Sequence, residues 1–144
     1  MRIVLDTTIL VRANQNTQGL GRQLLLRVIE HRHTLLVSDE LLYELARVLR
    51  YPRLQAAYGL SEEKVYEFIG FLREVPHVVT LDPFVLVPIR DINDIAILQT
   101  AVIGEADVLC TTDDDFYDAE TAGFLNKLGI HLLGDIDLMH LLRF

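Results

Sequence analysis

The chain has 144 residues, of which 51% are hydrophobic, and a formal net charge of −8. This length suits a single domain over residues 1–144 with a substantial core, and the hydrophobic content excludes a disordered chain. The acidic balance argues against a simple nucleic-acid-binding protein, but it allows a metal-dependent nuclease whose bound cations offset its acids. No apolar stretch is long enough to span a bilayer and no signal-like segment opens the sequence, so we expect a cytoplasmic protein.

A short apolar run, residues 3–5, opens the chain. A run that is apolar at every position is typical of a strand covered on both faces, as in the centre of a parallel sheet. Asp6 follows directly, at the carboxyl end of this strand, where ligands bind in open α/β sheets. Two interpretations are open for Asp6. It is either a turn former or helix N-cap, or a metal ligand with the hydroxyls of Thr7 and Thr8 beside it.

Strands and helices alternate along the rest of the chain. In order, the patterns predict a helix over 20–29, a strand over 34–37, a helix from Ser38 to about Arg50, a helix opened by Ser61, a strand over 78–81, a helix over 90–104, a strand over 107–111, a helix over 121–128, a strand over 130–133 and a terminal helix from Asp135. Pro52 is expected to end the second of these helices. The alternation predicts a three-layer α/β sandwich, with a central parallel sheet of about four or five strands flanked by helices.

Glu44 lies within the predicted helix that Ser38 opens, three residues after Leu41 and four before Val48. This spacing places it at the margin of the apolar face rather than opposite that face. Two interpretations remain open here as well. Glu44 either forms a salt bridge with Arg47, three residues on, or points into an acidic cleft.

Further acids follow at two later boundaries between elements. Asp91 has the side chain of an N-cap, and Asp94 occupies the third position of the helix that follows it. Asp113 and Asp115 come directly after the predicted strand at residues 107–111. These positions are therefore expected at the same edge of the sheet as Asp6, the edge formed by the carboxyl ends of the strands.

In a parallel sheet, the carboxyl ends of the strands and the first turns of the following helices lie at one edge, so these acids can meet in one cleft. The acids are Asp6, Glu44, Asp94, Asp113 and Asp115. Close carboxylates disfavour one another's ionisation unless a cation is present, and ligands that are all oxygen suit Mg²⁺ or Mn²⁺ rather than zinc. One or two such ions support phosphoryl chemistry, so the pattern favours cleavage of a phosphodiester.

Four stretches carry a family resemblance, at residues 3–10 (Ile-Val-Leu-Asp-Thr-Thr-Ile-Leu), 38–49 (Ser-Asp-Glu-Leu-Leu-Tyr-Glu-Leu-Ala-Arg-Val-Leu), 90–94 (Arg-Asp-Ile-Asn-Asp) and 106–115 (Ala-Asp-Val-Leu-Cys-Thr-Thr-Asp-Asp-Asp). In this order and spacing they resemble the PIN-domain ribonucleases, especially the toxin half of prokaryotic VapBC-type toxin–antitoxin pairs. No single stretch is specific, whereas the four together are. The resemblance covers nearly the whole chain and implies a PIN-like fold and a divalent-metal-dependent endoribonuclease.

The resemblance also implies roles for single residues. The acidic ligands and catalytic residues of the family correspond to Asp6, Glu44, Asp94 and Asp113, and Asp115 corresponds to a further acid that assists a second metal. Thr111 corresponds to a hydroxyl that supports the first aspartate. The chain departs from the family pattern at Thr8, Ile92, Asn93 and Thr112. Asp94 is retained, although Asp91 is placed to exchange roles with it. The implied cofactor is Mg²⁺ or Mn²⁺, as one or two ions.

The partners implied by the resemblance are an RNA substrate, a cognate antitoxin protein and a second copy of the chain in a homodimer. Arg47, Arg50 and Arg53 recur every three residues beyond Glu44. They are expected either to contact RNA phosphates or to form a solvated, salt-bridged surface.

Two other functions fit part of the pattern. One is a catalytically weak or inactive PIN-fold module that binds RNA or a partner protein. The other is a phosphatase or receiver-type domain that uses Asp6 as nucleophile or phosphoacceptor. A receiver also needs a lysine after a late strand, and the two lysines, Lys64 and Lys127, are not placed for this role. The absence of a Gly-rich loop ending in Lys-Ser or Lys-Thr excludes a P-loop protein. Among the remaining functions, the sequence favours the nuclease because all four acids of the PIN pattern are retained.

Overall fold

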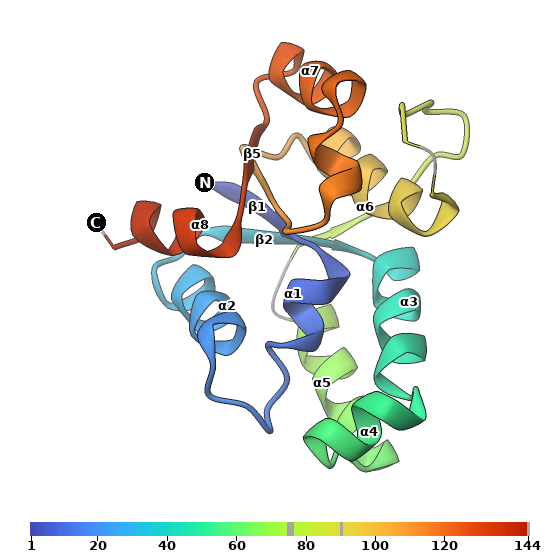
Figure 1. The fold of residues 1–144 in the computed structure, drawn as a ribbon, viewed down its shortest axis with the longest axis vertical. Coiled ribbons are helices and arrows are strands. Elements are labelled where there is room, and N and C mark those ends of the chain that lie inside the picture. Colours follow the sequence, from blue (N-terminus) through green and yellow to red (C-terminus); the bar gives the residue numbers. More distant parts are fainter. Residues whose placement is uncertain (75–76, 90, 144) are drawn as a thin grey trace.

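Five parallel strands form the central sheet of the computed structural model, which describes residues 1–74, 77–89 and 91–143. The strands are β1 (Arg2–Leu5), β2 (Thr34–Ser38), β3 (His77–Val79), β4 (Val108–Cys110) and β5 (His131–Leu133). Their order across the sheet is β3-β2-β1-β4-β5, and every neighbouring pair runs parallel. The predicted parallel sheet is therefore confirmed (Figure 1).

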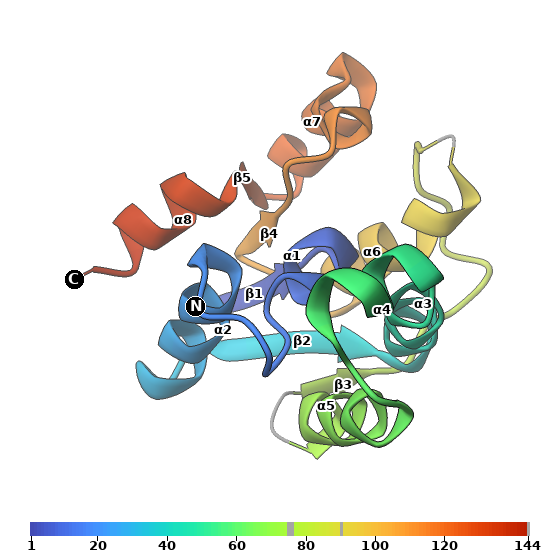
Figure 2. The same cartoon turned by 60° about the horizontal axis from the view of Figure 1, so that its bottom comes forward.

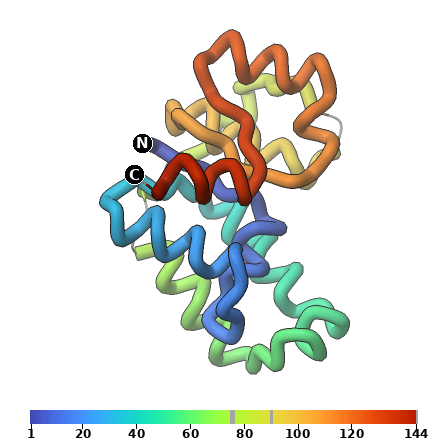
Figure 3. Tube along the Cα trace, turned by 60° about the vertical axis from the view of Figure 1, so that its left-hand side comes forward, coloured from blue at the N-terminus to red at the C-terminus, as the bar shows by residue number. Residues whose placement is uncertain are grey.

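Helices cover both faces of this sheet. They are α1 (Thr7–Val11), α2 (Leu20–Glu30), α3 (Asp39–Leu49), α4 (Pro52–Tyr58), α5 (Glu62–Glu74), α6 (Ile92–Ile103), α7 (Ala119–Lys127) and α8 (Asp135–Leu141), with a 3₁₀ turn, η1 (Asp114–Tyr117), before α7. Figures 1 and 2 show α1, α2 and α5 on one side of the sheet and α6 and α7 on the other. The C-terminal helix α8 lies against α2 (Figure 3). This arrangement confirms the three-layer sandwich.

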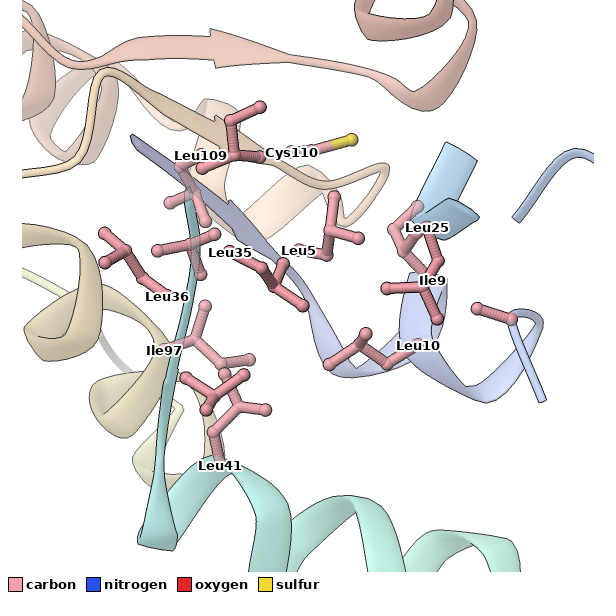
Figure 4. Packing of buried hydrophobic residues seen from close by; sticks show 14 of the residues in the cluster. Leu5, Ile9, Leu10, Leu25, Leu35, Leu36, Leu41, Ile97, Leu109 and Cys110 are labelled. Atoms are coloured by element: carbon pink, nitrogen blue, oxygen red, sulfur yellow. The ribbon is translucent and has the colours of Figure 1, made fainter. Parts of the chain in front are cut away.

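The core sits on both faces of the central strand. Ile3, Val4 and Leu5 of β1 are fully buried, as expected for a strand with helices on both sides. Figure 4 shows Leu5 close to Ile9 and Leu10 of α1, where all three belong to the same buried cluster. Burying a side chain of this size contributes about 1.5–3 kcal/mol, so β1 and α1 form a rigid base for the residue between them, at position 6.

Two helices were not predicted from the sequence. The helix α1 has five residues and begins one residue after β1, so it is too short to show a helical spacing in the sequence. The helix α4 begins at Pro52, which was expected only to end the preceding helix. Proline suits the first position of a helix because its missing N–H would have no partner there. The same residue therefore separates α3 from α4 and starts α4.

Other predicted boundaries lie close to the observed ones. Ser38 caps α3 by accepting a hydrogen bond from the N–H of Leu41, and Ser61 accepts one from the N–H of Lys64 at the start of α5. Arg90, where a helix was expected to begin, lies outside the described residues. Among the described helices, none is long and apolar enough to cross a membrane.

Candidate metal centre

Asp6 stands at the carboxyl end of β1, where the chain turns into α1. Its N–H donates a hydrogen bond of 2.9 Å to the carbonyl of Cys110 on the neighbouring strand β4. The residue is also the N-cap of α1, and it is only 2% exposed. The N-cap interpretation of Asp6 therefore holds. It does not compete with a ligand role, because each carboxylate oxygen carries two lone pairs.

Three donors fix the orientation of the Asp6 carboxylate. The N–H of Thr7 donates to Oδ1 at 2.6 Å, while the hydroxyls of Thr111 and Thr8 donate to Oδ2 at 2.6 Å and 3.3 Å. Burial raises the pKa of Asp6, the three hydrogen bonds oppose this rise, and the charge of Asp113 adds to it. Asp6 is therefore a rigid carboxylate in a site where negative charge is disfavoured.

Asp94 lies in the first turn of α6, whose N-cap is Asp91. The Asp91 carboxylate accepts a hydrogen bond of 2.9 Å from the N–H of Asn93, which sets the start of the helix. Asp94 is 7% exposed, and its Oδ2 is buried with no hydrogen-bond partner among the described residues. Burial is the main reason that the pKa of Asp94 is raised to about 7. Four nearby carboxylates raise it further, in decreasing order those of Asp113, Asp6, Asp91 and Asp115.

The turn after β4 brings two further acids to this edge. The hydroxyl of Thr111 accepts a hydrogen bond of 3.0 Å from the N–H of Asp113. Asp113 then caps η1 by accepting a hydrogen bond of 3.0 Å from the N–H of Asp115. One carboxylate oxygen from each of Asp91, Asp94 and Asp115 lies within 4.8 Å of the other two. Asp91 thus joins Asp94 in the cluster and does not replace it.

A divalent cation fits this set of residues. All the donors are oxygens, which is the ligand type that Mg²⁺ and Mn²⁺ prefer. The Oδ2 of Asp94 is buried and has no hydrogen-bond partner among residues 1–74, 77–89 and 91–143. A buried carboxylate oxygen without a partner is costly, and a bound cation would remove that cost.

Asp6 and Asp113 lie outside the group of three acids, although their charges raise the pKa of Asp94. Glu44 also lies outside this group. Its carboxylate accepts hydrogen bonds from Arg47, from Nε at 3.0 Å and from Nη2 at 2.7 and 2.8 Å. The Arg47 guanidinium also lies 5.9 Å from the ring centre of Tyr51. Of the two interpretations of Glu44, the structure therefore shows the salt bridge.

The other arginines of the predicted RNA-binding series lie on the surface around α3 and α4. Arg50 forms an ion pair with Glu62 of α5, with an Nη2–Oε1 distance of 2.6 Å. Arg53 is exposed and has no ion pair among the described residues. For Arg47 and Arg50, the structure shows the salt-bridged surface.

Two features near the site were not identified from the sequence. The hydroxyl of Tyr117 donates a hydrogen bond of 2.8 Å to the carbonyl of Thr111, which steadies the backbone beside Asp6. Asp135 pairs with Arg12 at 3.2 Å and so links α8 to the segment after α1. Asp135 directly follows β5 and Gly134, so the strand-end argument that identified Asp6 also applies to it. No comparable signal marks Tyr117.

Comparisons with known proteins agree with this architecture. A family model described as PIN domain matches residues 2–115 of the chain. No curated protein gives a match. Among solved structures, the chain is similar to the crystal structure of VapBC2 from Rickettsia felis bound to a DNA fragment from their promoter, with a TM-score of 0.60. The alignment covers 93% of this chain and 98% of that chain at 14% identity, which establishes a shared fold.

Proposed function

The chain belongs to the PIN domain family, and we propose that it is a divalent-metal-dependent endoribonuclease that hydrolyses phosphodiester bonds in RNA. The observation that carries this proposal is the buried Asp94 carboxylate. Its Oδ2 has no partner among the described residues, and Asp91 and Asp115 each place an oxygen within 4.8 Å of an oxygen of Asp94. Carboxylates this close favour a bound cation over three separate charges.

The site residues have distinct parts in this proposal. Asp6 is held by three donors, so its lone pairs are oriented before any ligand arrives, and such preorganisation favours tight, specific binding. Asp94, Asp113 and Asp115 supply the remaining carboxylates. When bound, one or two Mg²⁺ or Mn²⁺ ions would stabilise charge on the scissile phosphate and the leaving oxygen, and would lower the pKa of an attacking water.

Glu44 remains a proposed ligand and catalytic residue. For this role its carboxylate must exchange Arg47 for a cation, and Arg47 would then be free to contact an RNA phosphate. We propose the same contact for Arg50 and Arg53. The Glu44→Gln variant tests the ligand role. If Glu44 binds the cation, the variant needs a higher Mn²⁺ concentration for half-maximal cleavage, and if it only pairs with Arg47, that concentration does not change.

We further propose that the chain acts in the cytoplasm as the toxin of a toxin–antitoxin pair. Its fold is similar to that of VapBC2, and this similarity supports a cognate antitoxin protein as partner. A homodimer is the assembly that we propose for the chain. Co-expression with a neighbouring small open reading frame, followed by co-purification and sedimentation, tests the partner and the assembly together.

The decisive experiment is RNA cleavage by the whole chain with Mg²⁺ or Mn²⁺. We expect fragments from single-stranded or structured RNA in the presence of either ion, and none after a chelator is added. Cleavage that survives the chelator would contradict the metal-dependent mechanism. RNA binding without cleavage at any ion concentration would instead identify a module that only binds RNA.

A further inference from the structure

A cavity of about 660 Å³ opens beside the acidic group, between the segment that precedes α6 and the start of α7. Its lining includes Pro88, Ile89, Asp115, Tyr117, Asp118 and Glu120. Cavities of this size hold small ligands or single groups of a larger one. Because Asp115 belongs both to this lining and to the group of three acids, an occupant would lie next to the candidate metal centre.

Hydrogen bonds hold both walls of the cavity in place. The hydroxyl of Tyr117 donates to the carbonyl of Thr111 at 2.8 Å, yet the residue is 44% exposed, so its position is fixed while part of its surface stays open. The hydroxyl of Thr121, at the start of α7, donates to the carbonyl of Pro88 at 2.6 Å and so joins the two walls. A fixed aromatic ring facing an apolar wall provides a surface on which a nucleobase can stack.

The charged part of the lining consists of carboxylates. Asp118 and Glu120 are exposed, and no lysine or arginine among the described residues lines the cavity. Carboxylates repel a phosphate and accept hydrogen bonds from N–H groups. The cavity therefore suits a base that presents donors rather than the backbone of an RNA.

We infer that this cavity is a guanine-binding subsite for RNA, an inference that rests on the proposed ribonuclease function. Of the four bases, only guanine presents two adjacent N–H donors, at N1 and at the 2-amino group, which match the two oxygens of a carboxylate. In adenine and cytosine the amino group lies beside an acceptor nitrogen, and in uracil the single N–H lies between two carbonyls. A guanine stacked on Tyr117 with its donors on Glu120 would place a neighbouring phosphate at the acidic group.

The test uses nucleosides, which lack a phosphate and therefore report on the cavity without the metal centre. Guanosine, inosine, adenosine, cytidine and uridine are titrated into the whole chain with a chelator present, and saturation-transfer NMR measures binding. We expect guanosine to bind about tenfold more tightly than each of the others. Inosine is the sharpest comparison because it lacks only the 2-amino group.

Two variants place the effect in the cavity. Glu120→Gln and Tyr117→Leu should each weaken guanosine binding about tenfold, whereas Tyr117→Phe, which keeps the ring, should retain it. Glu67→Gln, at an exposed position of α5, is the matched control and should bind guanosine like the native chain. Thermal unfolding shows that each variant is folded.

Three outcomes decide between the inference and its alternatives. Equal binding of all five nucleosides, or tighter binding of N-acetylarginine amide than of guanosine, would overturn the guanine subsite, and the second result would indicate a basic peptide instead. RNA cleavage with no preference for guanosine would overturn the subsite and leave the nuclease proposal standing. Selective guanosine binding by a chain that cleaves no RNA would support the subsite and overturn the nuclease.

Discussion

Acidic residues at the carboxyl edge of the sheet and on the surface formed by α3 and α5 differ in whether they have an arginine partner. On that surface, each of three acids has an arginine partner, in the pairs Glu44–Arg47, Glu62–Arg50 and Asp39–Arg73. At the sheet edge, Asp6, Asp94, Asp113 and Asp115 form no salt bridge within the described part of the chain. The chain thus pairs these three surface acids with its own arginines and leaves the buried Asp6 and Asp94 without a counter-ion among the described residues.

This difference is informative because burial makes an unpaired charge expensive. Exposed ion pairs contribute little to stability, so the surface pairs have little effect on folding. A carboxylate such as Asp94, with 7% exposure and other acids close by, costs free energy in the metal-free chain. Retaining such a group is expected where an external cation, rather than the fold, supplies the balancing charge.

The largest expected effect comes from removing the unpaired charge. We expect Asp94→Asn to lower metal-dependent RNA cleavage about a thousandfold, because a bound metal supplies several kcal/mol of transition-state stabilisation. Cleavage rates at saturating Mn²⁺ measure the loss, with Glu67→Gln as the control that keeps the native rate. Native cleavage by Asp94→Asn would remove Asp94 from the mechanism.

The pH dependence of stability sharpens the comparison. The pKa of Asp94 is raised in the folded chain to about 7 from an ordinary value of 3.8, so the folded state holds its proton more tightly than the unfolded state. The resulting contribution to stability is present below about pH 4 and is lost as the pH rises through about 7. We expect the free energy of unfolding of the metal-free chain to fall on the order of 2–4 kcal/mol between about pH 4 and 8, relative to Asp94→Asn. Urea titrations across this range measure the free energy of unfolding. Identical pH profiles for the two proteins would show that the pKa of Asp94 is not raised in the folded chain.

Divalent cations should stabilise the chain through the same carboxylates. At a Mg²⁺ concentration about a hundred times the dissociation constant, the expected gain is roughly 2.7 kcal/mol. Thermal unfolding with and without Mg²⁺ measures this gain, which should be nearly absent in Asp94→Asn. Equal stabilisation of the variant would indicate that the ion binds elsewhere.

The smallest effect is expected on the surface formed by α3 and α5. Arg73→Gln breaks an ion pair whose side chains are 62% and 56% exposed, so we expect a loss of only about 0.5 kcal/mol in the free energy of unfolding. Chemical denaturation measures this change, which should be the same with and without Mg²⁺. A loss several times larger, or one that depends on Mg²⁺, would break the distinction between the two regions.

Much of the fold was predictable because its signals are local. Continuous apolar runs identified the buried strands, and cap residues such as Ser38 and Asp91 set the starts of two helices. The helices α1 and α4 were missed for equally local reasons. The first has only five residues, which are too few to show a helical period, and the second begins at a proline that was expected only to end the helix before it.

Part of the candidate site was predictable for the same reason. Strand ends and helix starts share one edge of a parallel sheet, and this rule alone predicts that Asp6, Asp94, Asp113 and Asp115 lie near one another. The rule gives a position along the edge but not the partner of a side chain. Glu44 lies in the second turn of α3 rather than at its start, and its carboxylate pairs with Arg47, three residues along the helix.

By itself, the sequence determined the order of the strands, the class of fold and which acids follow those strands, because each of these depends on residues close together in the chain. The tertiary structure alone decided which acids are buried, which lack a partner and which walls enclose the cavity. Those properties depend on contacts such as the one between Thr111 and Asp6, which are 105 residues apart. A pattern of neighbouring residues carries no information about the burial or the desolvation that such distant contacts produce.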